Sequence, residues 1–245
     1  MKGKMTRPSP KSHDALTLLP LPPKLLGIRL HLYTNILHVN RLPFLLVISG
    51  GLNYVSVISL TKRTKRNIIK GLLREINRYV RRGMIVDHVH GDGEYDKEDI
   101  RNAVKPATLE IRAPEEHCGV AERSVRTVKD RTRCAMNNLP YTQYPKVMVR
   151  NLVPLSAQML NRFPSDHGVS DTISPAELVD GVEKFDFSKK HIPFGAFAQV
   201  YTGTDNSQDE RCVEAIALRS SNQQNGYYFM SLQTGERISS NKWNQ

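Results

Sequence analysis

The order of hydrophobic periodicities along the chain is the feature that most constrains its fold. Apolar and polar residues alternate from Ile28 to Tyr33, which is typical of a strand. The same strand signal continues at 36–39, 44–48 and 54–60. From Arg63 to Arg82 apolar positions instead recur every three or four residues, which predicts an amphipathic helix that ends at Gly83. Three strands followed by a helix favour a sheet with helices packed against it.

Strands and helices then alternate before an all-β segment closes the chain. Further strands are predicted at 85–89 and 108–111, and further helices at 96–103, 117–137, 146–161 and from Ser174. After Lys190 the helical pattern stops, and short strands are predicted at 197–201, 212–218, 226–232 and 236–243. We therefore expect an α/β core followed by a separate small antiparallel β-barrel.

This pattern divides the chain into four predicted parts. Residues 1–26 form a linker or an ordered leader, 27–165 the core, 166–191 a connecting segment and 192–245 the barrel. The uncharged stretch from Leu42 to Leu60 contains Gly50-Gly51 and is predicted to be two strands and a turn, not a membrane span. Three isolated cysteines exclude a disulfide framework and a zinc site.

The charge balance indicates a polyanionic partner. The formal net charge is +11 and the sequence pI is about 9.7, which fits nucleic acid, although a basic protein without such a partner is the simpler alternative. Nine cations between Lys62 and Arg82 lie on the polar face of the predicted helix, against Glu75 alone. This face is either a solvated surface or a nucleic-acid contact that includes Lys62, Arg63, Lys65 and Arg66.

One candidate site is the segment Gly91-Asp92-Gly93, which follows a predicted apolar strand. Glycines on both sides of a carboxylate would let a metal ion or phosphate approach the backbone closely. The alternative is an ordinary Asp-Gly turn. Two residues upstream, His88 and His90 share one strand face, where packing is a simpler explanation than metal binding.

A second candidate lies on the predicted helix 117–137. Glu122 heads a row of cations at spacings of four, three and four, on a face separate from the apolar stripe; the cations are Arg126, Lys129 and Arg133. An ion pair between Glu122 and Arg126 would explain the acid but not the surplus of cations. A metal-binding acid beside phosphate-binding cations explains both, and Asp92 with Glu122 would then form part of a two-metal phosphodiester site. Oxygen ligands suit Mg²⁺ or Mn²⁺.

An ordered set of segments resembles the integrases of copia-type retrotransposons. The segments are His31–Asn40, Asp92–Glu94, Glu116–Arg123, Arg126–Arg133, Leu160–Pro164, Ile173–Pro175, Pro193–Ala196, Gly226–Leu232 and Thr234–Gly235. The resemblance covers essentially the whole chain. It implies a ribonuclease-H-like core, namely a mixed five-stranded sheet flanked by helices, in which two aspartates and a glutamate bind two metal ions for DNA strand transfer.

The resemblance also assigns residues and partners. By position, Asp92 is the second aspartate and Glu122 the glutamate, while Arg123 joins the phosphate-binding row on the helix. Implied partners are the DNA ends of the element, target DNA and further copies of the chain in the nucleus, with no membrane and no small-molecule substrate.

The first aspartate is replaced by Asn35 in this chain. Asparagine keeps an oxygen ligand but loses the charge that would compensate two cations, which puts the second ion in doubt. Asp87, Glu94 and Asp96 are near in sequence, but nothing indicates that one of them fills the gap. The hypotheses are an integrase impaired at Asn35, a catalytically inactive nucleic-acid-binding or assembly module, and, less well supported, a ribonuclease-H-like nuclease with another role.

Overall fold

The computed structural model describes residues 18–112, 119–166, 168–184, 191–203, 210–221 and 226–245. These residues form two compact units. The core unit contains Leu18–Met136 and Val153–Phe185, and the C-terminal unit contains Asn137–Leu152 together with Asp186–Gln245. The boundary between them falls inside one helix, next to Pro154, which has no N–H group to donate within that helix.

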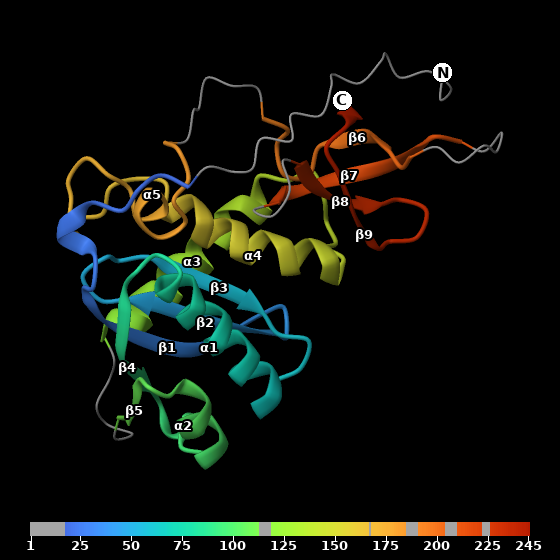
Figure 1. The fold of residues 1–245 in the computed structure, drawn as a ribbon. Coiled ribbons are helices and arrows are strands. Elements are labelled where there is room, and N and C mark those ends of the chain that lie inside the picture. Colours follow the sequence, from blue (N-terminus) through green and yellow to red (C-terminus); the bar gives the residue numbers. More distant parts are fainter. Residues whose placement is uncertain (1–17, 113–118, 167, 185–190, 204–209, 222–225) are drawn as a thin grey trace. The chain divides into compact units, whose positions relative to one another are not determined.

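A five-stranded mixed sheet is the centre of the core unit (Figure 1). Its strands are β1 (Arg29–Val39), β2 (Leu42–Ser49), β3 (Val55–Ser59), β4 (Ile85–Gly91) and β5 (Thr108–Ile111). The order is β3-β2-β1-β4-β5, with β2 antiparallel to both β1 and β3, and β4 parallel to both β1 and β5. The ribonuclease-H-like core predicted from the sequence is therefore confirmed.

Helices lie beside this sheet and continue into the C-terminal unit. They are α1 (Lys65–Val80), α2 (Glu98–Val104), α3 (Gly119–Asn137), α4 (Lys146–Leu160) and α5 (Pro175–Val179), with short 3₁₀ turns η1 (Pro23–Leu25) and η2 (Gly93–Tyr95). Thr64 caps α1, and Gly83, with φ +78°, follows its end as predicted. Ser174 and Glu177 form the capping box of α5, which confirms the predicted helix start.

Helix α1 packs closely against one face of the sheet. Its buried Ile68 and Leu72 share a core with Leu32 and Leu45 of the central strands. Gly71 permits this approach, because a Cβ at that position would lie 2.6 Å from Leu45 Cδ2.

The opposite face of the sheet is also covered. Phe44 and Leu46 alternate with Leu45 on β2, and all three are fully buried. Helix α3 buries Ala121 and Val128, and it joins the second half of α4 through a hydrogen bond of 3.1 Å between Thr132 Oγ1 and Ser156 Oγ. Helix α3 and the second half of α4 therefore pack against each other within the core unit.

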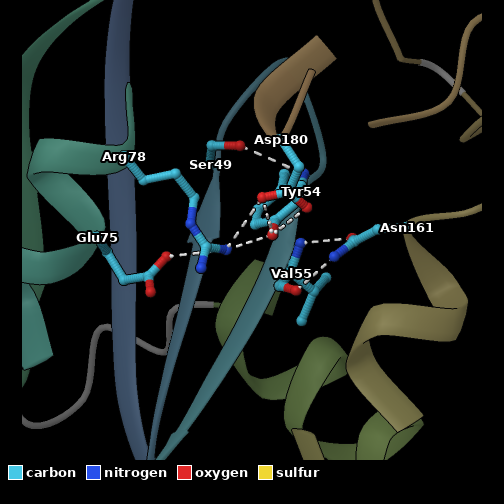
Figure 2. Close-up of polar contacts among 7 residues, drawn as sticks. All are labelled: Ser49, Tyr54, Val55, Glu75, Arg78, Asn161 and Asp180. Carbon is cyan, nitrogen blue, oxygen red and sulfur yellow. Dashed lines mark hydrogen bonds and ion pairs between the residues drawn. The ribbon is translucent and has the colours of Figure 1, made fainter. Parts of the chain in front are cut away.

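A buried polar network joins α1 to distant parts of the core unit (Figure 2). Arg78 donates to the Tyr54 hydroxyl, which in turn donates to Asp180 at 2.9 Å. The carboxylate of Glu75, fully buried on α1, lies 3.5 Å from the Arg78 guanidinium. Asn161 beyond α4 uses both ends of its amide on the backbone of Val55, at 2.7 and 2.9 Å.

The part of the leader that the structure describes belongs to the core unit. Leu21 and Leu25 are buried in the same core as α1, and Leu19 N donates to Gly181 O at 2.8 Å. The predicted leader over 1–17 lies outside the described residues.

The C-terminal unit is built on a five-stranded antiparallel sheet. Its strands are β6 (Phe197–Tyr201), β7 (Cys212–Ser221), β8 (Gly226–Ser231), β9 (Arg237–Ser240) and β10 (Trp243–Asn244), in the order β10-β6-β7-β8-β9. Phe229 is fully buried against Trp243 and Tyr227. On the other face Met230 packs with Met148 of the first half of α4.

One predicted strand of this unit was wrong. The single strand expected over 236–243 divides into β9 and β10, which pair with β8 and β6 at opposite edges of the sheet. A turn separates them, in which Lys242 N donates to Ser240 Oγ at 3.2 Å. A side-chain acceptor of this kind competes with the ladder hydrogen bonds that would have continued the strand.

Candidate active site

Asn35 lies within β1, and Asp92 directly follows the neighbouring strand β4. The parallel pairing of β1 with β4 ends with Tyr33 opposite His90. Asn35 lies two positions after Tyr33, and Asp92 two positions after His90, at the start of η2. Both candidate residues therefore follow the last residue pair of the β1–β4 ladder.

Thr34 links β1 to β4 through a side-chain hydrogen bond. Its buried hydroxyl donates to the carbonyl of His90 at 2.8 Å, one residue beyond the last pair of the ladder. Because side chains alternate along a strand, Thr34 faces the α1 side with Leu32, and Asn35 faces the opposite side. The threonine holds β1 and β4 in register where the candidate residues begin.

The glycines beside Asp92 differ in their surroundings. Gly91 makes room for the ring of Tyr95, since a Cβ there would lie 2.8 Å from the ring atom Cδ2. A Cβ on Gly93 would meet no atom within 4 Å. Asp92 caps η2 by accepting a hydrogen bond of 3.0 Å from Glu94 N. The segment thus forms a turn in which Asp92 is exposed.

Each of the three acids near the candidate residues in sequence is bound to an arginine. Asp87 accepts two hydrogen bonds from Arg29 at 2.8 and 2.9 Å, and this contact lowers the Asp87 pKa. Glu94 forms an ion pair with Arg63. Asp96 accepts from Arg101 at 2.7 Å. The charge of each of these carboxylates is thus already balanced by a cation.

A column of stacked rings occupies the sheet face away from α1. His31 stacks on His88 with ring centroids 4.6 Å apart, and Tyr33 stacks on His90 at 4.7 Å. Glu110 of β5 lies 2.7 Å from His88 Nδ1 and 3.0 Å from His90 Nδ1. The sequence placed the two β4 histidines on one face, but their partners come from strands 20 to 60 residues away and follow only from the register.

Both ring nitrogens of His90 are in hydrogen bonds. Burial is the main cause that lowers the His90 pKa, while the charge of Glu110 opposes that shift. A neutral ring that donates from Nδ1 to Glu110 accepts at Nε2, which lies 3.0 Å from His31 Nδ1. His90 therefore has no free lone pair for a metal ion, and the packing interpretation of this histidine holds.

Helix α3 presents Glu122 on its first turn and the predicted cations along its length. Arg123 donates to Gly119 O at 3.0 Å, and Arg133 pairs with Asp130 of the same helix at 3.0 Å. Arg126 is exposed. The Glu116–Cys118 part of the resembling segment lies outside the described residues.

The cations of α1 divide into two groups. Four of them serve the fold: Arg63 binds Glu94, Lys65 binds Asp99 at 2.8 Å, Arg78 enters the buried network, and Arg82 donates to Leu178 O at 3.1 Å. The surplus inferred from sequence is therefore smaller than nine. The five others are exposed and form no ion pair with another described residue; they are Lys62, Arg66, Lys70, Arg74 and Arg81.

The donor set does not fit a complete two-metal site. Asp92 supplies a carboxylate and Asn35 an amide oxygen, both of which suit Mg²⁺ or Mn²⁺. Within the described part of the chain, however, no three His, Cys, Asp or Glu side chains are grouped so that they could hold a metal ion. A two-metal centre needs several carboxylates to balance its cations, and Asn35 contributes no charge to that balance.

Comparison with known proteins supports the fold. No protein-family model and no curated protein matches the sequence. Among solved structures, a chain of the simian T-cell lymphotropic virus intasome in complex with PP2A regulatory subunit B56 gamma matches with a TM-score of 0.50 at 13% identity, over 97% of this chain and 82% of that one. The BIV integrase catalytic core domain matches with a TM-score of 0.48 at 20% identity, over 61% of this chain and 93% of that one.

At these identities the intasome match shows the fold alone. Together with the strand order, it defines the chain as integrase-like in architecture, with a ribonuclease-H-like core and a C-terminal antiparallel sheet. Among the helices that the structure describes, none combines the length and apolar character needed to span a bilayer.

Proposed function

We propose that this protein is an integrase-like DNA-binding protein whose metal-dependent strand transfer is impaired at Asn35. The observation that supports the proposal is the parallel pairing of β1 with β4, because Asn35 and Asp92 each follow its last residue pair by two positions. The family that the sequence resembles has an aspartate at both positions. We assign the chain to the copia-type retrotransposon integrases on the strength of that resemblance.

In this proposal the two acids keep their ancestral positions. Asp92 and Glu122 would be metal ligands for Mg²⁺ or Mn²⁺, and Asn35 would be a weakened third ligand. Arg123, Arg126, Lys129 and Arg133 on α3, with the exposed Lys62 and Arg66 at the start of α1, would contact DNA phosphates. The ends of the element and a target duplex are the DNA partners, and further copies of this chain the protein partner, in the nucleus.

A second candidate function is a catalytically inactive module that binds nucleic acid or supports assembly. The pairing of Asp87, Glu94 and Asp96 with arginines favours it, because the charges of these three carboxylates are already balanced by cations. The two candidates share a fold and a partner, and they differ in whether the wild-type chain joins DNA.

The variant Asn35→Asp distinguishes them. We expect this variant to bind Mg²⁺ at least about tenfold more tightly than wild type, which corresponds to ~1.4 kcal/mol, and to gain Mg²⁺-dependent DNA joining. Calorimetry and a strand-transfer assay are the measurements. Asn102→Asp, on an exposed position of α2, adds the same charge elsewhere and is the matched control.

Three outcomes are informative. If the wild-type chain joins DNA and the variants Asp92→Ala and Glu122→Ala do not, the chain is a working enzyme. The proposed impairment at Asn35 is then wrong. Joining only by Asn35→Asp would show a decayed enzyme in which the wild-type chain retains DNA binding. No metal binding by a folded Asn35→Asp, judged by circular dichroism, would remove the proposed site itself.

A further inference from the structure

The exposed cations of α1 form a continuous stripe. Arg66, Lys70, Arg74 and Arg81 lie at spacings of four, four and seven residues, which at 100° per residue keeps them within an arc of about 80°. The buried residues Ile68, Leu72, Ile76 and Tyr79 occupy the opposite side of the helix. With a rise of 1.5 Å per residue, the stripe is about 22 Å long.

No acid of α1 neutralises this stripe. The helix has a single acidic residue, Glu75, and its side chain is fully buried on the packed side beside Arg78. Along the helix axis the first three cations of the stripe are about 6 Å apart, and Arg81 lies about 10 Å beyond Arg74. Phosphates recur every 3.4 Å of axis along each strand of duplex DNA, so charge complementarity favours a duplex backbone over an isolated anion.

The stripe lies on the other side of the central sheet from Asn35. Helix α1 shares a core with Leu32 and Leu45, whereas Asn35 faces away from that core. A helix is about 10 Å in diameter, so both the helix and the sheet separate the stripe from Asn35. A straight duplex bound along the stripe therefore does not reach Asn35.

We propose that the α1 stripe binds a second duplex segment, separate from the one held at the Asn35–Asp92 edge. This inference rests on the proposed DNA-binding function and adds a second DNA-contacting surface to it. The contacts are to phosphates and carry no sequence preference, because a stripe of arginine and lysine on an exposed helix has no route to base edges without entering a groove.

The test is the salt dependence of duplex binding in EDTA, where no metal chemistry takes place. The stripe variant is Arg66→Gln/Lys70→Gln/Arg74→Gln. If three phosphate contacts are lost, the slope of log K against log salt becomes shallower by about 2.7. Between 50 and 200 mM salt, wild-type binding would then weaken about fortyfold more than binding by the variant. Fluorescence anisotropy with a blunt 20-base-pair duplex of arbitrary sequence measures both quantities.

A matched control separates the stripe from net charge. The variant Lys24→Gln/Lys97→Gln/Lys105→Gln removes the same charge from exposed positions of the core unit outside α1. We expect its slope to change by less than half as much. Sedimentation at saturating DNA should show two duplexes per wild-type chain and one per stripe-variant chain.

Each contrary result has a distinct meaning. If the stripe variant and the control variant show equally shallow salt slopes, net charge alone explains the effect. That result would overturn the proposal. So would one duplex per chain in wild type, or a change in oligomeric state without a change in DNA binding. If the wild type binds duplex and the stripe variant shows the same slope of log K against log salt, only the stripe proposal is overturned. If the wild type does not bind duplex, the proposed DNA-binding function is overturned as well.

Discussion

Replacing Arg78 with methionine should destabilise the core unit strongly. Arg78 is 19% exposed and lies 3.5 Å from the fully buried Glu75, while it also donates to the Tyr54 hydroxyl. Removing one partner of a buried ion pair leaves an uncompensated charge, at a typical cost of about 3–5 kcal/mol. For a unit of this size that corresponds to a fall in Tm of about 10 °C.

The pH dependence of this loss identifies Glu75 as its cause. Burial raises the pKa of Glu75 above its ordinary value, and the charge of Arg78 opposes that rise. Without Arg78 the rise should be larger. A folded-state pKa above the unfolded one means that the native state holds the proton more tightly, so stability increases as pH falls through that interval. Arg78→Met should therefore recover part of its lost stability between pH 7 and pH 5.

Urea unfolding followed by circular dichroism measures the effect. Arg74→Met, exposed on the same helix, is the control and should stay within about 0.5 kcal/mol of wild type. Adding Glu75→Gln to Arg78→Met should restore at least about 1 kcal/mol, because the buried charge is then gone. A loss below 1 kcal/mol for Arg78→Met at pH 7, or no rescue in the double variant, would refute the reasoning.

Two further changes test the packing that positions the candidate site. Gly71→Ala should cost about 1–3 kcal/mol of unfolding free energy, because its Cβ would lie 2.6 Å from Leu45 Cδ2 and force α1 away from the sheet. Gly119→Ala is the control, since no atom lies within 4 Å of its Cβ. We expect it to cost nothing measurable in the same urea unfolding experiment. Thr34→Val should cost about 1–2 kcal/mol, since it leaves the His90 carbonyl without its donor, and an unchanged midpoint would show that the β1–β4 edge does not depend on this bond.

Much of the fold was predictable because its signals are local. The strand at 108–111 and the strand at 197–201 have the predicted bounds, since alternation over a few residues is enough to define them. The end of α1 at Gly83 and the start of α5 at Ser174 follow from cap residues within one turn of each helix. The asparagine at position 35 was also recognised from the sequence. This recognition depends on a single position within one strand, compared with the pattern of the family that the chain resembles.

The partners of charged and polar side chains were not predictable in the same way. Arg63 and Lys65 counted as free cations in the sequence, yet they bind Glu94 and Asp99, which lie 31 and 34 positions away. The contact of Gly91 with the Tyr95 ring was not predictable either, because the folded turn brings the ring beside the glycine.

The sequence by itself determined most of the strands and helices, which residue stands at each candidate position, and how much positive charge the chain carries. Tertiary structure alone decided which cations remain exposed, that three histidines and Glu110 meet on one sheet face, and that the two compact units divide α4 between them. The physical reason is the range of the interactions. Periodicity and capping act within a few residues, whereas a partner across a sheet depends on the register of strands far apart in the chain.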